Sequence, residues 1–214
     1  MADVEALKKA AGIAACDFVK TGMKVGLGTG STVKHTVVEL GRRMADEGLE
    51  IVGVPTSLAT EKLAIEVGIP LVELSDIDGL DLVIDGADEY DPDFQLIKGG
   101  GGALTREKIL AYSSDKFICI VDDSKHTDLL GKFPLPIEVL EIARSAISRE
   151  IMKMGGKPIY RNGFITDNGN QIIDVHNLLI KIPFELEEKI NNIPGVIENG
   201  IFSNRKADVI VKAK

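Results

Sequence analysis

The fold of this chain is decided by residues 23–32, which read Met23-Lys24-Val25-Gly26-Leu27-Gly28-Thr29-Gly30-Ser31-Thr32. The first five residues predict a short strand, the glycines predict a tight turn, and apolar residues at helical spacing predict a helix that continues to about Glu47. A strand, a glycine turn and a helix in this order place backbone amides and hydroxyls around a phosphate group. Ser31 and Thr32 are candidates for capping the helix and for binding a ligand oxygen, and these two roles are compatible.

Strand-like and helical segments alternate on both sides of this stretch. The alternation predicts an α/β fold, in which a Rossmann-like parallel sheet carries helices on both faces. The expected elements are helices over 3–20, 57–67 and 103–112 and strands over 51–54, 71–72, 80–84 and 117–121. Ligands bind such sheets beyond the carboxyl ends of the strands, so the turn at 28–30 and the segments after the other strands are the places to look for a site.

The pattern changes near Lys132-Phe133-Pro134-Leu135-Pro136, where the prolines predict a domain boundary. Beyond it the sequence predicts a second, smaller α+β domain with few ligand-type residues. Its expected elements are helices over 143–154 and 184–192, strands over 157–160 and 171–175, and a last strand pair that begins at 196. The predicted domains are therefore a catalytic domain of residues 1–129 plus 205–214 and a small domain of residues 130–204, which is expected to serve oligomerisation. A strand at 208–211 pairs back with one of the two.

Charge and composition argue against several classes of function. The 214 residues carry a net charge of −8 at pH 7 and include no Trp, which disfavours a nucleic-acid partner, a base-stacking platform and an anionic membrane surface. No apolar run approaches the roughly 20 residues of a membrane span. Cys16 and Cys119 stand in apolar patterns without C-x-x-C spacing, as expected of buried, reduced thiols. We expect a cytoplasmic protein that binds neither nucleic acid nor membranes.

Common cofactor and nucleophile motifs are not met. Gly30 is followed by Ser31-Thr32 without the lysine of a P-loop. The turn glycines lie two apart, which breaks the dinucleotide fingerprint, and Pro55-Thr56 stands where that fingerprint needs an acid. The three histidines are widely separated and no G-x-S-x-G elbow is present, so neither a zinc site nor a catalytic triad is predicted. No cofactor is expected.

Residues 98–108 form a second candidate site, Lys98-Gly99-Gly100-Gly101-Gly102-Ala103-Leu104-Thr105-Arg106-Glu107-Lys108. Glycine at this density is destabilising unless the backbone bends sharply or approaches something closely. Bare amides before a helix N-terminus predict a seat for an anionic or polyhydroxylated ligand. Glu107 falls in the first turn of that helix, where the helix dipole favours the ionised carboxylate and exclusion of water disfavours it.

The acidic cluster Asp85-Gly86-Ala87-Asp88-Glu89 follows an expected strand and has three interpretations. It is a polar turn, or a Mg²⁺ site made of two carboxylates and a substrate phosphate, or a pair of carboxylates that binds sugar hydroxyls. The spacing does not fit an EF-hand, and no resident metal is predicted.

Together these parts suit acid–base chemistry on a phosphorylated sugar. A carbonyl moves between C1 and C2 when a base takes a proton from C2 and returns it to C1. Other groups must stabilise charge on the oxygens of the enediolate that forms in between. One carboxylate suits the first task, and a lysine with a second acid suits the other.

Six motifs in order resemble ribose-5-phosphate isomerase, type A, over about residues 5–212. They are 28–32, 85–89, 98–108, Gly131–Pro136, Thr166–Asn170 and Asn204–Asp208. The resemblance implies a metal-independent aldose–ketose isomerase that interconverts D-ribose 5-phosphate and D-ribulose 5-phosphate through an enediol(ate), as a homodimer or homotetramer. It also implies a Rossmann-like domain, a small α+β domain and a C-terminal strand that returns to the first. One departure is Gly102, which stands where the family often has alanine.

The resemblance implies a role for each matching residue. Glu107 is then the base that moves the proton between C1 and C2, and Asp85 is a candidate for ring opening. The phosphate or its neighbouring hydroxyls are contacted by Lys8, Thr29, Gly30, Ser31 and Thr32. The sugar is bound by Asp85, Gly86, Ala87 and Asp88, the enediolate by Lys98 with the amides of Gly99, Gly100 and Gly101, and Lys125 completes the ligand shell. On spacing alone, Lys8 belongs to a solvated helix face.

Two other functions stay open at this point. A sugar-phosphate-sensing module would bind the same ligand without turning it over, but it has no need of Glu107 and Lys98, which are both present. A Mg²⁺-dependent phosphotransfer enzyme or phosphatase would use Asp85 and Asp88, and activity in excess chelator would count against it.

Overall fold

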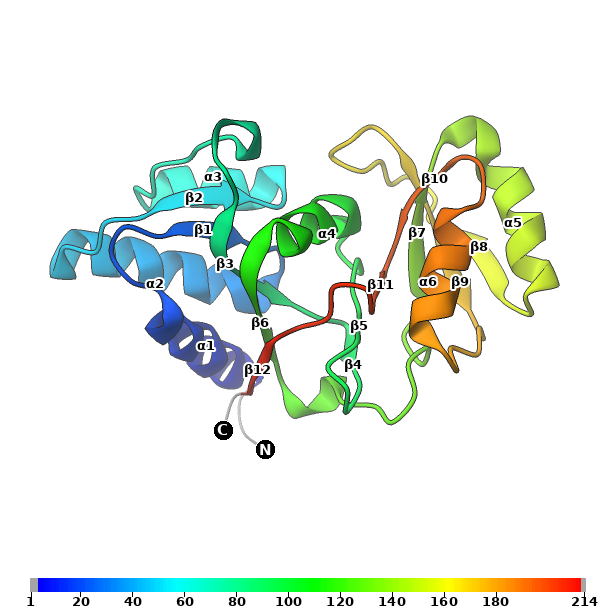
Figure 1. Cartoon of the computed structure of the whole chain (residues 1–214), viewed down its shortest axis with the longest axis horizontal. Helices are drawn as coiled ribbons and strands as arrows, with labels where there is room; N and C mark the ends of the chain where they lie inside the picture. The colour runs from blue at the N-terminus through cyan, green and yellow to red at the C-terminus, as the bar shows by residue number, and fades with distance from the viewer. Residues whose placement is uncertain (1–3, 213–214) are drawn as a thin grey trace. The chain divides into compact units, whose positions relative to one another are not determined.

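The computed structural model describes residues 4–212 and divides the chain into two compact units (Figure 1). The first comprises Met1–Gly86, Arg106–Ser124 and Ala207–Lys214, and the second comprises Ala87–Thr105 and Lys125–Lys206. The predicted domains differ from these units, because residues 87–105, 125–129 and 205–206 lie in the second unit. The glycine run therefore belongs to the smaller unit and not to the parallel-sheet domain. The chain crosses between the units four times, and a change of pattern near one proline-rich segment reveals only one such crossing.

All five strands of the first unit run parallel, in the order β12-β6-β3-β1-β2. They are β1 (Lys24–Leu27), β2 (Val52–Pro55), β3 (Leu80–Gly86), β6 (Ser114–Val121) and β12 (Val209–Lys212). The predicted α/β class and parallel sheet are confirmed. The expected strand at 71–72 is only a single bridge between Leu71 and Gly53. The C-terminal strand pairs with β6, so it returns to the first unit.

The helices of this unit bury apolar stripes. They are α1 (Val4–Ala15), α2 (Ser31–Glu47), α3 (Leu58–Glu66) and α4 (Leu104–Tyr112), with short 3₁₀ turns η1 (Cys16–Phe18), η2 (Leu74–Asp76) and η3 (Asp123–Lys125). α1 and α2 lie side by side along the sheet (Figure 1). Val33, Val37 and Leu40 of α2 share one core cluster with alternate residues of β3, Leu82 and Ile84. Burial of each such side chain contributes roughly 1.5–3 kcal/mol, which fixes α2 and the turn before it.

The helix predicted over 3–20 is shorter than expected. α1 ends at Ala15, and residues 16–18 form the 3₁₀ turn η1, while residue 3 lies outside the described residues. Buried Cys16 and Val19 lie in the same core cluster as α2, so the apolar spacing that extends the predicted helix is core packing.

The second unit has an antiparallel sheet of order β10-β7-β9-β8 and a small three-stranded sheet of order β11-β5-β4. Its elements are β4 (Glu89–Tyr90), β5 (Leu96–Ile97), β7 (Leu135–Val139), η4 (Glu141–Ala143), α5 (Arg144–Lys153), β8 (Lys157–Tyr160), β9 (Gln171–His176), α6 (Pro183–Asn191), β10 (Val196–Asn199) and β11 (Ile201–Phe202). The segment expected to be a boundary instead leads into β7, whose residues are all buried. Pro136 is tolerated there because β10 pairs with β7 only from Ile137 onward.

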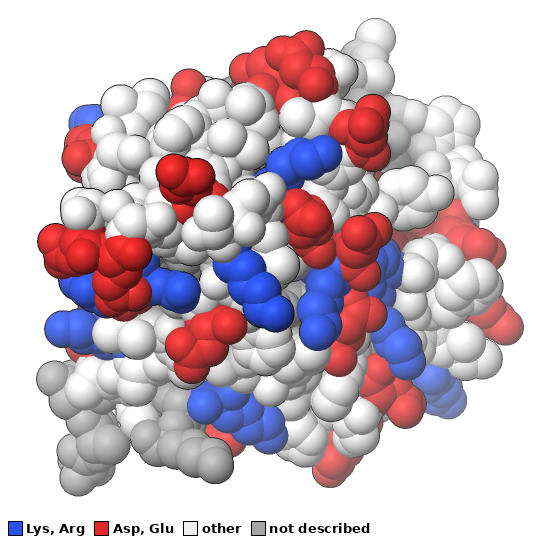
Figure 2. All heavy atoms as spheres, turned by 60° about the vertical axis from the view of Figure 1, so that its left-hand side comes forward, with Lys and Arg blue, Asp and Glu red and all other residues white. Residues whose placement is uncertain are grey.

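The surface carries both signs of charge. On the face shown in Figure 2, Lys and Arg side chains are interspersed with Asp and Glu side chains. On α2, Arg42 forms ion pairs with Glu39 at 2.6 Å and with Glu47 at 2.6 Å. The hydrogen bond from Arg42 lowers the pKa of Glu39. Within residues 4–212 no helix combines the length and the apolar character that crossing a membrane requires.

Candidate active site

The turn after β1 has no room for a side chain at its first residue. A Cβ on Gly28 would lie 2.3 Å from Asp85 Oδ1 and 2.6 Å from the carbonyl oxygen of Ile84. The amide of Gly28 donates to that carbonyl at 3.0 Å, and the amide of Thr29 donates to Asp85 Oδ1, also at 3.0 Å. Gly30 then takes a φ of +120°, which favours glycine. The glycines thus bring the turn directly against the end of β3, and Thr29 and Asp85 meet as the edge rule for parallel sheets predicts.

The hydroxyl of Thr29 lies in a cluster of hydroxyls that follows β2. Its Oγ1 is 2.7 Å from Thr56 Oγ1 and donates to Ser57 Oγ at 2.8 Å. Thr60 Oγ1 donates to the carbonyl of Gly28 at 2.8 Å, and Ser57 also caps α3 by accepting from the amide of Thr60 at 3.2 Å. Three buried hydroxyl residues therefore fix the turn through both the side chain of Thr29 and the backbone of Gly28.

The N-terminus of α2 opens onto a pocket of about 400 Å³. Thr29, Gly30 and Ser31 line it, together with Lys34 one turn further along α2. Gly30 and Ser31 are exposed, so their amides and hydroxyl are accessible to a ligand. Exposed backbone amides at a helix start, with a lysine beside them, suit an anion such as a phosphate group.

Asp85 is the last but one residue of β3 and is almost completely buried, with 1% of its surface exposed. Its Oδ1 accepts hydrogen bonds from two amides, those of Thr29 at 3.0 Å and of Gly86 at 2.8 Å. Amide donors hold a carboxylate in one orientation. Asp85 and Gly86 belong to the first unit, whereas Ala87 and Asp88 belong to the second.

In the second unit, the glycine run folds into a tight turn against Asp88. The amide of Gly100 donates to Asp88 Oδ2 at 2.7 Å, and the amide of Gly102 donates to the carbonyl of Gly99 at 2.9 Å. A Cβ on Gly100 would lie 2.7 Å from Asp88 Oδ1, and Gly99 has a φ of +97°. The glycines are thus required by close approach and by backbone conformation, as the sequence predicts for a ligand loop.

The fourth glycine is also constrained. Gly102 has a φ of +82°, and a Cβ there would lie 2.2 Å from Cζ of Phe164. Both the backbone conformation and the close packing against Phe164 therefore require glycine at this position. Gly101 is exposed and Gly102 is buried.

Lys98, which opens the run, is a buried lysine with 2% of its surface exposed. Its amide donates to the carbonyl of Gly200 at 2.9 Å, and its Nζ lies 5.4 Å from the ring centroid of Phe202, within cation–π range. Lysines are seldom buried to this extent without a specific function or partner.

Glu107 lies in the first turn of α4, in the first unit, and only 5% of its surface is exposed. Lys8 on α1 and Lys125 at the end of η3 are both partly exposed. Glu89, the last acid of the cluster at 85–89, accepts from the amides of Gly131 at 2.8 Å and Phe133 at 2.6 Å. Its carboxylate therefore holds a loop of the second unit and is not directed to a sugar.

The His, Cys, Asp and Glu side chains of the described residues bear on metal binding and on thiol chemistry. In the part of the chain that the structure describes, no group of three or more His, Cys, Asp and Glu side chains is arranged to hold a metal ion. Both cysteines are buried and unbridged. Burial raises the pKa of the Cys16 thiol to about 12, which keeps it protonated and unreactive.

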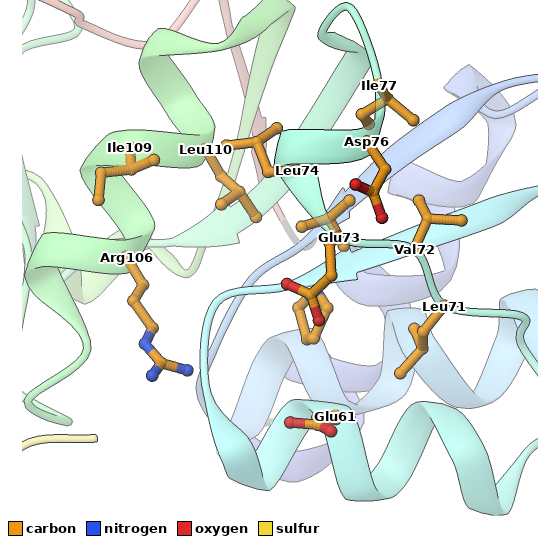
Figure 3. Close-up of a pocket in the computed structure, with 12 residues that line it drawn as sticks. Glu61, Leu71, Val72, Glu73, Leu74, Asp76, Ile77, Arg106, Ile109 and Leu110 are labelled. Atoms are coloured by element: carbon orange, nitrogen blue, oxygen red, sulfur yellow. The ribbon is translucent and has the colours of Figure 1, made fainter. Parts of the chain in front are cut away.

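A further pocket of about 580 Å³ lies between α4 and the segment that follows β2 (Figure 3). Its polar groups are Glu61, Glu73, Asp76 and the guanidinium of Arg106, which extends from α4. Glu107, the neighbour of Arg106, is not among its lining residues, and neither is any other residue predicted to bind the sugar phosphate.

Comparison with known proteins agrees with this architecture. Residues 52–214 match the family model described as ribose 5-phosphate isomerase A (phosphoriboisomerase A). The chain belongs to the ribose 5-phosphate isomerase A family. Membership identifies it as an isomerase, and its combination of a five-stranded parallel sheet with a smaller antiparallel sheet is that of the family's solved structures.

Several solved members of the family are similar along their whole length. The ribose 5-phosphate isomerase A of Neisseria gonorrhoeae is 46% identical, with a TM-score of 0.96 over 100% of this chain and 95% of that one. The protein from Methanocaldococcus jannaschii is 44% identical, with a TM-score of 0.95 over 99% and 96% of the two chains. A D-ribose-5-phosphate isomerase solved in complex with phospho-erythronic acid is 45% identical, with a TM-score of 0.95 over 97% and 94%.

Sequence reasoning missed some of the residues that shape the turn after β1 and the glycine run. Thr56 and Ser57 follow β2, so the rule that ligands bind at the carboxyl ends of strands was a usable signal for them. Arg161, which contacts the glycine run, follows β8 of the small unit and is 61 residues from Gly100. No local pattern distinguishes it from a solvated arginine.

Proposed function

We propose that this chain interconverts D-ribose 5-phosphate and D-ribulose 5-phosphate through an enediol(ate), without a metal, with Glu107 as the base. The observation that carries the proposal is the burial of the Glu107 carboxylate in the first turn of α4, directly after a glycine turn. Two effects act on this carboxylate in opposite directions: exclusion of water makes it a stronger base, and the helix N-terminus makes it a weaker one. Family membership supplies the substrate class.

The phosphate is proposed to bind at the start of α2. Gly30, Ser31 and Thr32 offer amides and hydroxyls, and the pocket there includes Lys34. Thr29 takes part mainly by fixing the turn, since its amide and hydroxyl are both engaged within the first unit. Lys8 is proposed as an additional cation for the phosphate or its neighbouring hydroxyls.

Ring opening and sugar binding are assigned to the acids at 85–88. Asp85, held by two amides, is proposed to take the proton of the anomeric hydroxyl and to return it to the ring oxygen as the C1–O4 bond breaks. Asp88 is proposed to bind a sugar hydroxyl, and the amide of Gly100 holds its carboxylate in place. Gly86 and Ala87 line the sugar with backbone groups.

Proton transfer then proceeds on the open-chain sugar. Glu107 takes the C2 proton of the aldose and returns it to C1, and at the enediolate the hydroxyl proton on O2 passes to O1, so that negative charge develops first on O1 and then on O2. The ammonium group of Lys98 and the backbone amides of Gly99, Gly100 and Gly101 are proposed to stabilise that charge, and Lys125 to complete the ligand shell. A buried cation and fixed amides stabilise developing charge more strongly than water does.

Isotope incorporation with a paired substitution tests the assignment. Wild type, incubated with ribose 5-phosphate in deuterated water, should form ketose with deuterium at C1. Glu107→Gln should lower kcat by roughly 10²–10⁴-fold with ligand binding largely retained. Glu187→Gln is the matched control, because Glu187 is also buried but accepts from the amides of Ser203 and Asn204.

Each outcome of that experiment is decisive. Ketose formation by Glu107→Gln near the wild-type rate would refute the assignment of the base. Binding of ribose 5-phosphate by wild type without ketose formation would favour a sensing module. In a separate assay with excess chelator, loss of activity would favour the hypothesis that Asp85 and Asp88 bind Mg²⁺.

The remaining expectations are proposals that rest on the family resemblance. We propose that the chain acts in the non-oxidative pentose phosphate pathway in the cytoplasm and that it assembles as a homodimer or homotetramer. Its small-molecule partner is a sugar phosphate, with neither nucleic acid nor membrane involved. Sedimentation velocity at micromolar concentration measures the assembly, and a single species of monomer mass would refute it.

A further inference from the structure

One arginine of the small unit, Arg161, binds backbone carbonyl groups of the glycine run. Arg161 directly follows β8, and 19% of its side chain is exposed. Its Nη1 donates to the carbonyl of Gly100 at 3.1 Å, and the carbonyl of Gly99 lies 3.5 Å from both Nη1 and Nη2. The guanidinium thus spans two successive peptide groups of the loop.

The guanidinium is itself held from two other sides. Its Nε donates to Asp174 Oδ2 on β9 at 2.8 Å, and Nη2 forms a second bond to Oδ1 of the same carboxylate. Its Cζ lies 5.3 Å from the ring centroid of Phe164, within cation–π range. A bidentate carboxylate and an aromatic ring fix the plane of an arginine. The remaining N–H groups therefore have a defined direction, and that direction is toward Gly99 and Gly100.

Fixing a carbonyl also fixes the amide on the other side of its peptide group. A trans peptide is planar, and its C=O and N–H point in opposite directions. The carbonyls of Gly99 and Gly100 share their peptide groups with the amides of Gly100 and Gly101. Because Arg161 binds the oxygens, the two amides point away from it. The amide of Gly100 accordingly meets Asp88 Oδ2 at 2.7 Å.

This contact matters because glycines are costly to order, and Arg161 adds to the bonds from the amides of Gly100 and Gly102 that already hold the loop. Each glycine loses roughly 1–2 kcal/mol of backbone entropy when it is fixed, and glycine loses more than any other residue. Amides stabilise a developing oxyanion only if they already point to the place where the charge appears. An arginine that holds two consecutive carbonyls supplies that order before the substrate arrives.

We propose that Arg161 is a positioning residue for the isomerisation. Through the Gly99 and Gly100 carbonyls it sets the direction of the amides of Gly100 and Gly101, and through Gly100 it sets the carboxylate of Asp88. It touches no reacting atom. This inference rests on the proposed function, since the amides it orders are those assigned to the sugar and the enediolate.

Arg161→Met is the informative substitution, because methionine keeps the packing against Phe164 and removes every donor. Arg144→Met is the matched control. The Cζ of Arg144 lies 4.1 Å from the ring centroid of Tyr160, and its Nη1 donates to Gln171 Oε1 on β9 at 2.9 Å, but no bond joins it to the glycine run among the hydrogen bonds of the described residues. Arg161→Lys retains a cationic donor group and should recover part of the lost function.

The readouts separate positioning from folding. Arg161→Met should lower kcat by about 10–100-fold, the range expected when catalytic groups are displaced by a fraction of an ångström or more. Inhibition by phospho-erythronic acid should weaken by a similar factor, because its planar carboxylate resembles the planar enediolate. Inhibition by inorganic phosphate, which probes the start of α2, should change less than twofold, and Arg144→Met should behave as wild type throughout.

The failures are distinguishable. A wild-type chain that forms no ketose would overturn the proposed function and this inference with it. Active wild type with a kcat for Arg161→Met within twofold would overturn the inference alone. Equal loss of affinity for phospho-erythronic acid and phosphate would show general damage to the fold and would also overturn it. Exchange of the Gly100 amide, followed by NMR without ligand, should speed up at least tenfold in Arg161→Met, and unchanged exchange would contradict the proposed grip.

Discussion

Gly28 is the position where the first turn is most sensitive to an added methyl group. In Gly28→Ala the new Cβ would lie 2.3 Å from Asp85 Oδ1, 2.4 Å from its Cγ and 2.6 Å from the carbonyl oxygen of Ile84. The carbonyl is backbone within β3 and cannot swing away as a side chain does. The methyl therefore pushes the turn off the end of β3 and breaks the bond from the Thr29 amide to Asp85.

The size of the effect follows from these contacts. Overpacking of a rigid site costs about 1–3 kcal/mol, and loss of an amide bond to a carboxylate adds roughly 1.5–3 kcal/mol where the carboxylate stays buried. Partial relaxation makes the two terms overlap, so we expect Gly28→Ala to lose about 2–4 kcal/mol of unfolding free energy. For a chain of this length, each kcal/mol lowers Tm by roughly 2–4 °C. The Tm of this variant should thus fall by about 4–16 °C.

Gly86→Ala is the matched control, because Gly86 is the last residue of β3, the strand against which the turn at Gly28 packs. A Cβ there meets only the carbonyl oxygen of Ile120, at 3.7 Å, which is an ordinary contact. We expect its unfolding free energy to stay within about 0.5 kcal/mol of wild type. Urea unfolding followed by circular dichroism measures both variants. Equal stability of Gly28→Ala and Gly86→Ala would refute the reasoning, because it would mean that the turn is free to move away from β3.

Three further predictions concern the first unit. Thr29→Val, which removes the hydroxyl that joins the turn to the cluster after β2, should destabilise by about 1–3 kcal/mol in urea, and a neutral result would contradict a structural role for that cluster. Cys16, with a thiol pKa of about 12, should resist iodoacetamide at pH 8 unless the chain is unfolded. As the pH rises, the thiol loses its proton in the unfolded chain before it does so in the folded one, so the unfolding free energy should decline above about pH 8.5. Arg42 lowers the pKa of Glu39, so the ion pair stabilises the fold above the ordinary pKa of a carboxyl group, and this stabilisation is lost as the pH falls. Glu39→Gln should therefore lower the unfolding free energy by about 0.5 kcal/mol at pH 7 and by less at pH 3. A difference that does not depend on pH would argue against the ion pair.

The parallel sheet was predictable because its signals are local. The strand over 24–27 and the helix over 31–47 that follows it are each determined by a short apolar pattern with a glycine or polar residue at its end. The two-residue strands β4 and β5 were not predicted, and for β11 only a strand pair beginning at 196 was expected. They exist through pairing of segments far apart in the chain, such as Ile97 with Ile201, and two residues carry no periodicity of their own.

The site was predictable where it follows the ends of strands. Thr29 and Asp85 could be placed together because parallel strands end at one edge of a sheet, and their amide–carboxylate bond confirms that placement. Membership of the glycine run in the small unit was not predictable from its neighbours in sequence. It depends on contacts such as Arg161 to Gly100, which only the folded chain brings together.

Polar groups of the small unit hold the glycine run of residues 99–102 and the start of the helix after it. Glu138 of β7 is fully buried, yet its carboxylate accepts from the Thr105 hydroxyl, from Thr166 Oγ1 at 2.8 Å and from Asn170 Nδ2 at 2.9 Å. A buried carboxylate is destabilising unless such donors surround it. One of its donors, Thr105, lies in the first turn of α4, two residues before Glu107, while Arg161 holds the other end of the loop. Residues of this unit thus fix the glycine run at both ends. Ordering of the run is a structural role for the small unit in addition to the oligomerisation that is expected of it.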